Sequence, residues 1–257
     1  MISEFVSIHP DAKIGPNAEI GPFTTIAGDV EIGEGTKIYN NVTILDGARI
    51  GKNCTIFPGA VVSGIPQDLK FRGEVTTAVI GDGTVLRECV TVNRGTASKG
   101  TTIVGSNCLI MAYCHVAHDC KLGNQVIMSN ACQLAGEVVV DDCAVIGGGT
   151  LVHQFCHIGS YVMIQGGALI NKDIPPYVKA AREPISFVGL NIIGLRRRGF
   201  TSDQIHEIQD IYHLLFQSGL NYSNAVDRIE ETLPETDIRN QICAFVRNSE
   251  RGVIKGV

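Results

Sequence analysis

Residues 8–56 read IHPDAKIGPNAEIGPFTTIAGDVEIGEGTKIYNNVTILDGARIGKNCTI, and every sixth residue of this stretch, beginning with Ile8, is isoleucine. The series continues with aliphatic residues to Ile170 and is broken only at Asp68, Glu74 and Ser98. A period of six is neither that of an α-helix nor that of a simple alternating strand. It is typical of a parallel β-helix, in which short strands turn corners and successive coils stack.

A second register lies two residues before each aliphatic position. The residues there are small or β-branched for most of the stretch, as at Val6, Ala12, Ala18, Thr24, Val30, Thr36, Val42 and Ala48. Side chains two apart on a strand point the same way, so both registers point into one narrow interior. The residue after the aliphatic position is often glycine, for example Gly15, Gly33 and Gly51. We expect these glycines to supply the positive φ angles of tight corners.

Six of the nine cysteines fall on the small inward register. They are Cys54, Cys108, Cys114, Cys120, Cys132 and Cys156. A free cysteine packs like a small hydrophobic residue, so we interpret the six as compact core residues rather than as a thiolate cluster or disulfides. The sequence suggests no partner for Cys89, Cys143 or Cys243.

The composition is that of a water-soluble chain of 257 residues with 44% hydrophobic residues and a formal net charge of −5. Such a charge argues against a protein that coats nucleic acid. The opening residues MISEFVSIHPDAK contain an acid where a signal peptide carries basic residues, and no apolar segment follows. No stretch is apolar for long enough to cross a bilayer. We therefore expect a cytoplasmic protein without stable membrane insertion or a nucleic-acid partner.

The six-residue repeat stops near Lys172, where two consecutive prolines close the segment Asp173–Pro176. The chain then changes its period from six to that of a helix. We predict a β-helix over residues 1–174 and a small helical domain over residues 175–257, which is long enough to fold as a separate unit.

Three helices are predicted in the second part. Thr201 and Gln204 have the spacing of a capping box, and apolar residues then recur at helical intervals as far as Gly219. Ser223 opens a second helix, and Pro234 precedes a third.

Two insertions interrupt the coils without disturbing the register. They cover residues 64–77 and 93–100, and both are polar. Loops that project from a rigid scaffold often carry binding chemistry, although a polar loop can also be merely solvated.

Histidines form the main concentration of chemistry-bearing residues, in the stretches 115–119 and 153–157. Residue 118 lies outside both inward registers, so its imidazole faces solvent or a neighbour. With 18 residues per coil after residue 102, Gly136 stacks one coil above His118 and Gln154 two coils above, at about 4.8 Å per coil. A base, a backbone N–H and an amide in one line suit the transfer of a group to a hydroxyl.

The spacing alone leaves other interpretations of these histidines open. A solvent-facing histidine at a corner can have no role at all. Hexapeptide folds can also hold zinc through histidines between subunits. Asp119 could orient an imidazole base or support a metal-ligating histidine.

Six segments of the chain carry a resemblance to a known family. They are Gln67–Lys70 (QDLK), His115–Cys120 (HVAHDC), Leu134–Gly136 (LAG), Val152–Phe155 (VHQF), Asp173–Tyr177 (DIPPY) and the region from Asn191 to Phe200. In this order and over nearly the full length, the chain resembles the UDP-N-acetylglucosamine 3-O-acyltransferases, the cytoplasmic enzymes that open lipid A biosynthesis. No phosphate-cradling or dinucleotide-binding glycine motif competes with this resemblance.

The resemblance implies a fold, an assembly and a donor. The fold is a left-handed parallel β-helix, an exception to the usual right-handed crossover. The family forms homotrimers with active sites in clefts between subunits. The acyl group arrives on the phosphopantetheine of acyl carrier protein, and no further cofactor or metal is implied.

The resemblance also implies roles for individual residues. His118 would be the general base at the sugar 3-hydroxyl, Asp119 would orient it, and the Gly136 N–H would hold the oxyanion. Residues expected to contact substrate are Gln67, Asp68, Lys70, His115, Glu137, His153 and Gln154, with Asn191, Arg197 and Arg198 serving the nucleotide or the carrier's arm. Residues expected to measure the acyl chain are Met163, Gln165 and Gly166, and an open slot at the glycine suggests a long chain.

Two positions depart from the family pattern. Glu137 stands where the family carries a histidine that contacts the sugar, and Ile193 stands where an acidic nucleotide contact is expected. The acceptor could therefore carry either a hydroxyl or an amino group at carbon 3.

Three other functions compete with the O-acyltransferase. One is the later UDP-3-O-acylglucosamine N-acyltransferase of the same pathway, which the QDLK loop and the arginine-rich tail disfavour. A carbonic-anhydrase-like zinc enzyme is the second. A purely structural β-helix is the third, and the clustered outward histidines argue against it.

Overall fold

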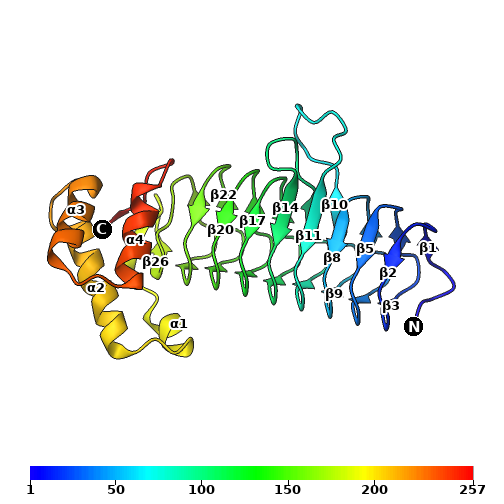
Figure 1. Cartoon of the computed structure of the whole chain (residues 1–257), viewed down its shortest axis with the longest axis horizontal. Helices are drawn as coiled ribbons and strands as arrows, with labels where there is room; N and C mark the ends of the chain where they lie inside the picture. Colours follow the sequence, from blue (N-terminus) through cyan, green and yellow to red (C-terminus); the bar gives the residue numbers. More distant parts are fainter. Residues whose placement is uncertain (257) are drawn as a thin grey trace.

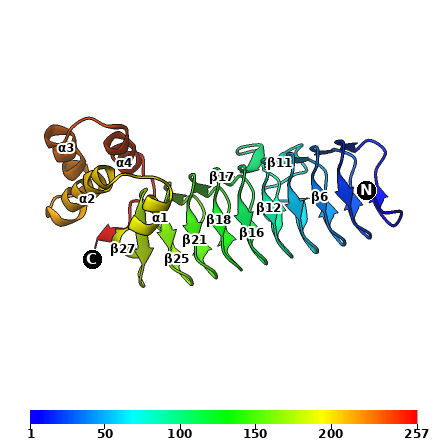
Figure 2. The same cartoon turned by 90° about the horizontal axis from the view of Figure 1, so that it is seen from below.

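The computed structural model describes residues 1–256 and shows a long parallel β-helix with helices gathered at its carboxyl-terminal end (Figure 1). The β-helix has three faces, and each face is a sheet whose strands come from successive coils (Figure 2). Residues 18 apart pair in parallel, as Ser7 does with Thr25. The predicted coil length and the parallel pairing are therefore confirmed.

The strands are short and are assigned here to three sheets. Sheet 1 contains β1 (Ser7–Ile8), β4 (Thr25–Ile26), β7 (Thr43–Ile44), β10 (Val61–Gly64), β13 (Thr91–Asn93), β16 (His115–Val116), β19 (Gln133–Leu134), β22 (Leu151–Val152) and β25 (Leu169–Ile170). Sheet 2 contains β2 (Lys13–Ile14), β5 (Val30–Ile32), β8 (Ala48–Ile50), β11 (Thr77–Ile80), β14 (Thr101–Val104), β17 (Lys121–Leu122), β20 (Val139–Val140) and β23 (His157–Ile158). Sheet 3 contains β3 (Glu19–Ile20), β6 (Lys37–Ile38), β9 (Thr55–Ile56), β12 (Val85–Leu86), β15 (Leu109–Ile110), β18 (Ile127–Met128), β21 (Val145–Ile146), β24 (Met163–Ile164), β26 (Val178–Ala181), β27 (Ser186–Leu190) and β28 (Lys255–Gly256).

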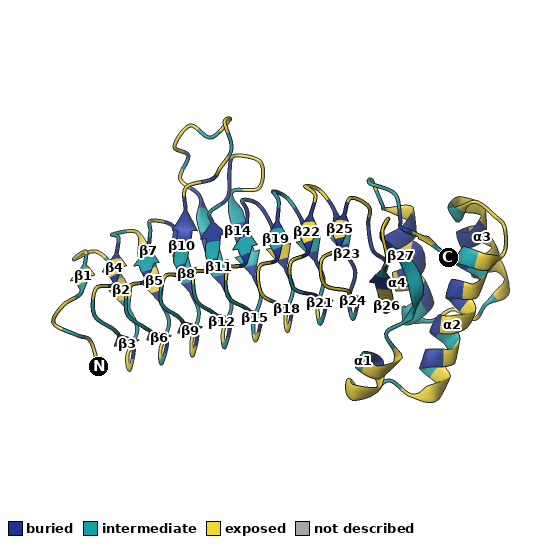
Figure 3. Cartoon of the chain, turned by 180° about the vertical axis from the view of Figure 1, so that it is seen from behind, coloured by how far each residue is buried: buried dark blue, intermediate teal, exposed yellow. Residues whose placement is uncertain are grey.

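The interior is filled by the two predicted registers, and burial alternates along the strands (Figure 3). All six cysteines of the small register are buried and none forms a disulfide, so their assignment to the core is confirmed. The Cys120 thiol, for example, donates to the Ala135 carbonyl oxygen at 3.1 Å. Burial raises the pKa of Cys120 to about 12, which keeps the thiol protonated.

Glycine is required after the aliphatic positions for a different structural reason from the one predicted. Gly15, Gly33 and Gly51 do not have positive φ; that conformation falls two residues later, as at Gly35 with φ +67°. A Cβ on Gly33 would lie 2.5 Å from the carbonyl carbon of Gly51 in the next coil. The prediction was wrong about backbone conformation, because these glycines are needed where stacked backbones leave no room for a side chain.

The two insertions leave the same edge of the β-helix, between sheets 1 and 2. Val61 pairs with Thr91 across a separation of 30, and Thr77 pairs with Thr101 across 24, so the coils are lengthened by twelve and six residues relative to 18. The edge continues through the corners at residues 117–120, 135–138 and 153–156. We call this row of corners, including both insertions, the site edge. Figure 1 shows the two loops projecting side by side.

The carboxyl-terminal part begins differently from the prediction. Residues 175–190 were assigned to a helical domain, but they contain β26 and β27, and β26 pairs in parallel with β24. The sheet therefore continues past the prolines, and the helices start only at Ile192. The repeat could not reveal this because β26 and β27 form an antiparallel pair with an irregular register.

Four helices follow: α1 (Ile192–Arg197), α2 (Ser202–Gln217), α3 (Tyr222–Thr232) and α4 (Asp237–Arg247). The capping box of Thr201 and Gln204 is present at α2, as predicted. The helices α3 and α4 start near the predicted positions with Asn221 and Thr236 as caps, and α1 was not predicted. In the part of the chain that the structure describes, no helix has the length and apolar character needed to span a membrane.

Candidate active site

His118 and Gly136 face each other across adjacent coils of the site edge. The Glu137 N–H donates to the His118 carbonyl oxygen at 3.0 Å, and the Phe155 N–H donates to that of Gly136 at 3.2 Å. A Cβ on Gly136 would lie 2.6 Å from Cε1 and 2.7 Å from Nε2 of His118. Within residues 1–256 the Gly136 N–H has no backbone acceptor. The predicted vertical line of imidazole, glycine and Gln154 is therefore present, and the Gly136 Cα lies next to the imidazole.

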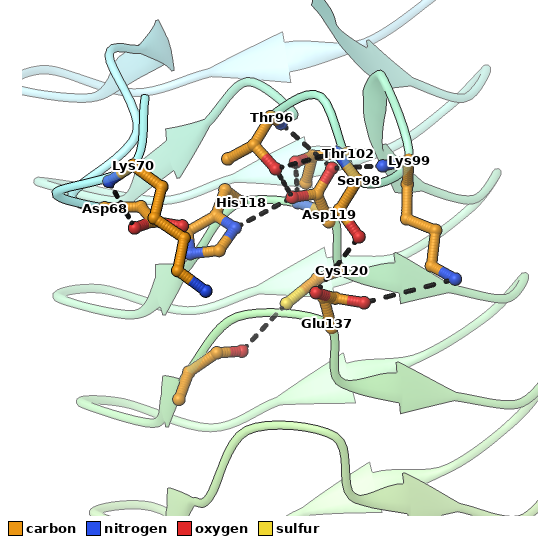
Figure 4. Close-up of polar contacts among 11 residues, drawn as sticks. Asp68, Lys70, Thr96, Ser98, Lys99, Thr102, His118, Asp119, Cys120 and Glu137 are labelled. Carbon is orange, nitrogen blue, oxygen red and sulfur yellow. Dashed lines mark hydrogen bonds and ion pairs between the residues drawn. The ribbon is translucent and has the colours of Figure 1, made fainter. Parts of the chain in front are cut away.

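Asp119 is enclosed between His118 and the second insertion (Figure 4). Its side chain has no solvent exposure, and that of His118 is 17% exposed. One oxygen, Oδ2, lies 2.8 Å from His118 Nδ1 and accepts from the Thr96 hydroxyl at 2.6 Å. The other, Oδ1, accepts from the backbone N–H of Thr96 at 2.9 Å and of Lys99 at 3.2 Å. Because a carboxylate can only accept, Nδ1 carries a proton, and in the neutral imidazole the lone pair is then on Nε2.

Glu137 contacts the same insertion from the next coil. Its Oε1 accepts from the Ser98 hydroxyl at 3.2 Å, and its Oε2 lies 4.0 Å from Lys99 Nζ. Sequence reasoning singled out the insertion but missed Thr96, Ser98 and Lys99. No periodic signal marks these three residues. The only signal that could have indicated them is that the carboxylate of Asp119, once buried, needs hydrogen-bond donors from a nearby segment.

His115 lies on β16, within sheet 1 beside the site edge. Its Nδ1 lies 2.7 Å from the Thr91 hydroxyl oxygen. Burial, followed by the nearby charge of His118, lowers the pKa of His115. The two imidazoles thus lie close enough to influence each other, and His115 is held neutral more readily than a free histidine.

The predicted substrate residues Gln67, Asp68 and Lys70 lie on the first insertion, which connects β10 to β11. The Asp68 carboxylate accepts the Lys70 backbone N–H at 2.8 Å, and neither side chain bonds to His118 within residues 1–256. Gln67 is exposed, and Leu69 is 96% exposed. The loop therefore exposes both polar and apolar side chains to solvent.

His153 and Gln154 are exposed on the upper corner of the site edge. His153 Nδ1 lies 3.0 Å from the Gln154 carbonyl oxygen and 3.2 Å from a guanidinium nitrogen of Arg251. Arg251 belongs to the tail that returns from α4, where the Asp173 N–H donates to the Gly252 carbonyl oxygen. The sequence held no signal for this contact, because the tail lies outside the repeat.

The remaining predicted residues lie on the other two edges. Asn191 caps α1, and its amide also donates to the Tyr161 carbonyl oxygen at 2.9 Å. Arg197 and Arg198 are both exposed, and the Arg198 guanidinium donates a hydrogen bond to the Gln125 side-chain oxygen. Residues 125 and 161 lie at corners between sheets 2 and 3. Residues 163–166 lie at the end of β24 and in the corner between sheets 3 and 1. One chain therefore does not bring all the predicted residues together.

Among residues 1–256, no group of three or more histidine, cysteine, aspartate or glutamate side chains is placed to hold a metal ion. The Asp119 oxygens instead accept hydrogen bonds from His118 and from the second insertion.

Comparisons with known proteins define the class and then the family. Residues 101–136 match the bacterial transferase hexapeptide repeat, residues 2–106 match the GMPPB C-terminal domain, and residues 173–254 match domain 2 of UDP N-acetylglucosamine O-acyltransferase. The fold and the histidine–aspartate pair thus define a hexapeptide-repeat transferase.

The relatives extend the match to the whole chain. Acyl-[acyl-carrier-protein]–UDP-N-acetylglucosamine O-acyltransferases from Chlorobaculum parvum and Halorhodospira halophila are 48% and 41% identical, each over 96% of this chain and 96% of the relative. The crystal structure of a UDP-N-acetylglucosamine acyltransferase from Bacteroides fragilis superposes with a TM-score of 0.98 at 55% identity, covering 99% of this chain and 100% of that one. The chain belongs to the acyl-[acyl-carrier-protein]–UDP-N-acetylglucosamine O-acyltransferase family, and its fold is the left-handed β-helix with a small helical domain that the resemblance implied.

Proposed function

We propose that this protein transfers a long-chain acyl group from acyl carrier protein to the 3-position of UDP-N-acetylglucosamine, the first step of lipid A biosynthesis. The observation that carries the proposal is the pair of a partly exposed His118 and a buried Asp119 next to Gly136, whose N–H has no backbone acceptor within residues 1–256. The reaction runs in the cytoplasm and requires no cofactor beyond the phosphopantetheine arm that carries the acyl group.

The chemistry follows from the geometry of this pair. His118 Nε2 takes the proton of the sugar hydroxyl as its oxygen attacks the thioester carbonyl carbon. The Gly136 N–H donates to the oxyanion that forms. Collapse of the intermediate breaks the carbon–sulfur bond, and the imidazolium returns its proton to the departing sulfur. Asp119 holds Nδ1–H throughout and stabilises the imidazolium.

A direct assay separates this function from its rivals. Purified protein is incubated with 3-hydroxyacyl carrier proteins and, in parallel, with UDP-N-acetylglucosamine, its 3-amino analogue or UDP-3-O-acylglucosamine. Mass spectrometry should show one added acyl group on the first acceptor. Acylation of UDP-3-O-acylglucosamine alone would identify the N-acyltransferase instead. Preference for the amino analogue would indicate that Glu137, in place of the family histidine, goes with an acceptor that carries an amino group at carbon 3.

The separation of the predicted residues onto three edges supports a homotrimer with shared sites. A ligand that touches His118 and also Gly166 or Arg197 must lie between neighbouring subunits. Lys70 makes no bond to His118 within residues 1–256, so we expect it to serve the site of a neighbouring subunit: Lys70→Ala and His118→Ala chains, each impaired alone, should regain part of the activity when they are mixed, unfolded and refolded together. Mixed trimers verified by mass that show no recovery would assign the first insertion to its own subunit.

The acyl-chain length is proposed to depend on Gly166. Its φ is not positive, and a Cβ would meet only the Gly148 backbone, with the carbonyl oxygen at 3.1 Å and the nitrogen at 3.7 Å, so a side chain fits once the Gly148 carbonyl shifts by a few tenths of an ångström. Gly166→Met should shift the preferred acyl chain to one several methylenes shorter, because each buried CH₂ contributes about 0.8 kcal/mol. Rates measured across a series of chain lengths check this.

Gly167 provides the matched control for chain length. It has φ +72° and nothing within 4 Å of its Cβ position. Gly167→Ala should therefore lower the melting temperature through backbone strain while leaving the chain-length optimum unchanged. The same optimum in Gly166→Met as in the unaltered protein would remove Gly166 from the acyl site.

A further inference from the structure

The second insertion encloses the Asp119 carboxylate. Three of the four hydrogen bonds to the Asp119 carboxylate come from this loop, two from backbone N–H groups and one from the Thr96 hydroxyl. Counted over the whole residue, backbone included, Thr96 is 7% exposed and Asp119 is 5% exposed. The contact between Thr96 and Asp119 is therefore buried.

The direction of the Thr96 hydroxyl is determined by its neighbours. The Ser98 N–H donates to the Thr96 hydroxyl oxygen at 3.1 Å, so that oxygen acts as an acceptor on one side. The hydroxyl proton then points to Asp119 Oδ2, the same oxygen that faces His118 Nδ1. A continuous chain of hydrogen bonds thus runs from the loop backbone through Thr96 and Asp119 to the imidazole.

A buried carboxylate remains charged only when donors replace the water it has lost. Without the loop, the structure would leave Asp119 with His118 as its sole partner. The carboxylate could then rotate or take up a proton, and either change would release Nδ1–H. The loop donors oppose both changes, and Thr96 is the member whose side chain can be altered without changing the backbone.

We propose that Thr96 is a positioning residue for the acyl transfer: its hydroxyl holds the Asp119 carboxylate with Oδ2 aimed at His118 Nδ1. The inference rests on the proposed function, because it assumes His118 as the base. It adds a residue that touches neither substrate nor reacting atoms and acts only through the aspartate.

Thr96→Val removes the hydroxyl and keeps the shape of the side chain. We expect kcat/KM to fall about 10- to 100-fold, the range for a lost hydrogen bond to a charged group. Asp119 Oδ2 is then no longer aimed at Nδ1 and stabilises the His118 imidazolium less, so the acid limb of the kcat/KM profile should move to lower pH. Thr96→Ser keeps the hydroxyl and should restore both the rate and the profile.

Thr84 offers a matched control for a structural effect. It is a fully buried threonine whose hydroxyl donates to the Gly105 carbonyl oxygen at 2.7 Å and accepts from the Cys108 N–H at 3.1 Å. Thr84→Val should lower the melting temperature without moving the acid limb. If Thr96→Val behaves like Thr84→Val, or keeps the unaltered rate and profile, the positioning role is wrong.

A double-mutant cycle tests whether Thr96 acts through Asp119. Thr96→Val should have little further effect on kcat/KM in an Asp119→Asn background, whereas full additivity would show that the two residues act independently. Thr96→Ala, which also lacks the hydroxyl, supplies the readout if Thr96→Val is unstable. Unchanged rates in both His118→Ala and Asp119→Asn would overturn the proposed mechanism itself, an outcome distinct from failure of Thr96 alone.

Discussion

His118→Ala should lower kcat by a factor of about 10² or more and leave the fold intact. Removal of a positioned general base typically costs about 10²–10⁴ in rate. His118 lies outside the aliphatic interior, and Asp119 keeps its three donors from the second insertion when the imidazole is lost. Initial rates at saturating substrate, with circular dichroism and oligomeric mass for the same preparations, check the prediction.

The result should not depend on metal. Exhaustive chelation of the unaltered protein is expected to leave its activity unchanged. A folded His118→Ala protein with a near-normal rate would exclude the imidazole as the base, and a rate that needs added zinc would favour the zinc alternative.

Gly136→Ala is the second change from which we expect a large loss, again about 10² or more in kcat. The backbone of Gly136 does not have positive φ, so alanine can adopt its conformation. The new methyl group would lie 2.6 Å from the His118 ring, however, so the ring must move away from the oxyanion donor. Misplacement of a reacting group by about 1 Å can cost about 10²-fold in rate.

Gly28 provides a control with similar local geometry far from the site. A Cβ there would lie 2.9 Å from Nδ1 of His9, and that histidine side chain is 54% exposed and can turn aside. Gly28→Ala should therefore leave kcat unchanged. Equal losses of kcat in both variants would indicate a general disturbance of coil stacking. Full activity in Gly136→Ala would show that catalysis does not depend on the position of the His118 ring next to Gly136.

The β-helix itself could be predicted from the sequence because its coils repeat. One aliphatic register defines the interior, and a constant coil of 18 residues predicts that His118, Gly136 and Gln154 lie in line, as they do. The same regularity misled the interpretation of Gly33, because a position-by-position rule about φ takes no account of the backbone stacked one coil away.

What the repeat could not predict lies where the chain departs from it. Thr96 meets Asp119 through a loop whose internal shape has no period, and Arg251 reaches His153 from the far end of the sequence. The segment 175–190 continues a sheet through an antiparallel pair that the hexapeptide pattern does not describe. Contacts between subunits are likewise absent from the spacing within one chain.

The two ends of the β-helix differ, and this difference implies an order of unfolding. The carboxyl-terminal end is covered by β26, β27 and the helices, whereas Val6, Ile8 and Ile14 of the first coil are only partly buried. In a stacked repeat each coil is stabilised mainly by its immediate neighbours, so amide exchange should be fastest at the amino-terminal coils and slow progressively toward the covered end. His118 lies several coils inside this gradient, where fraying of the open end leaves its alignment with Gly136 undisturbed.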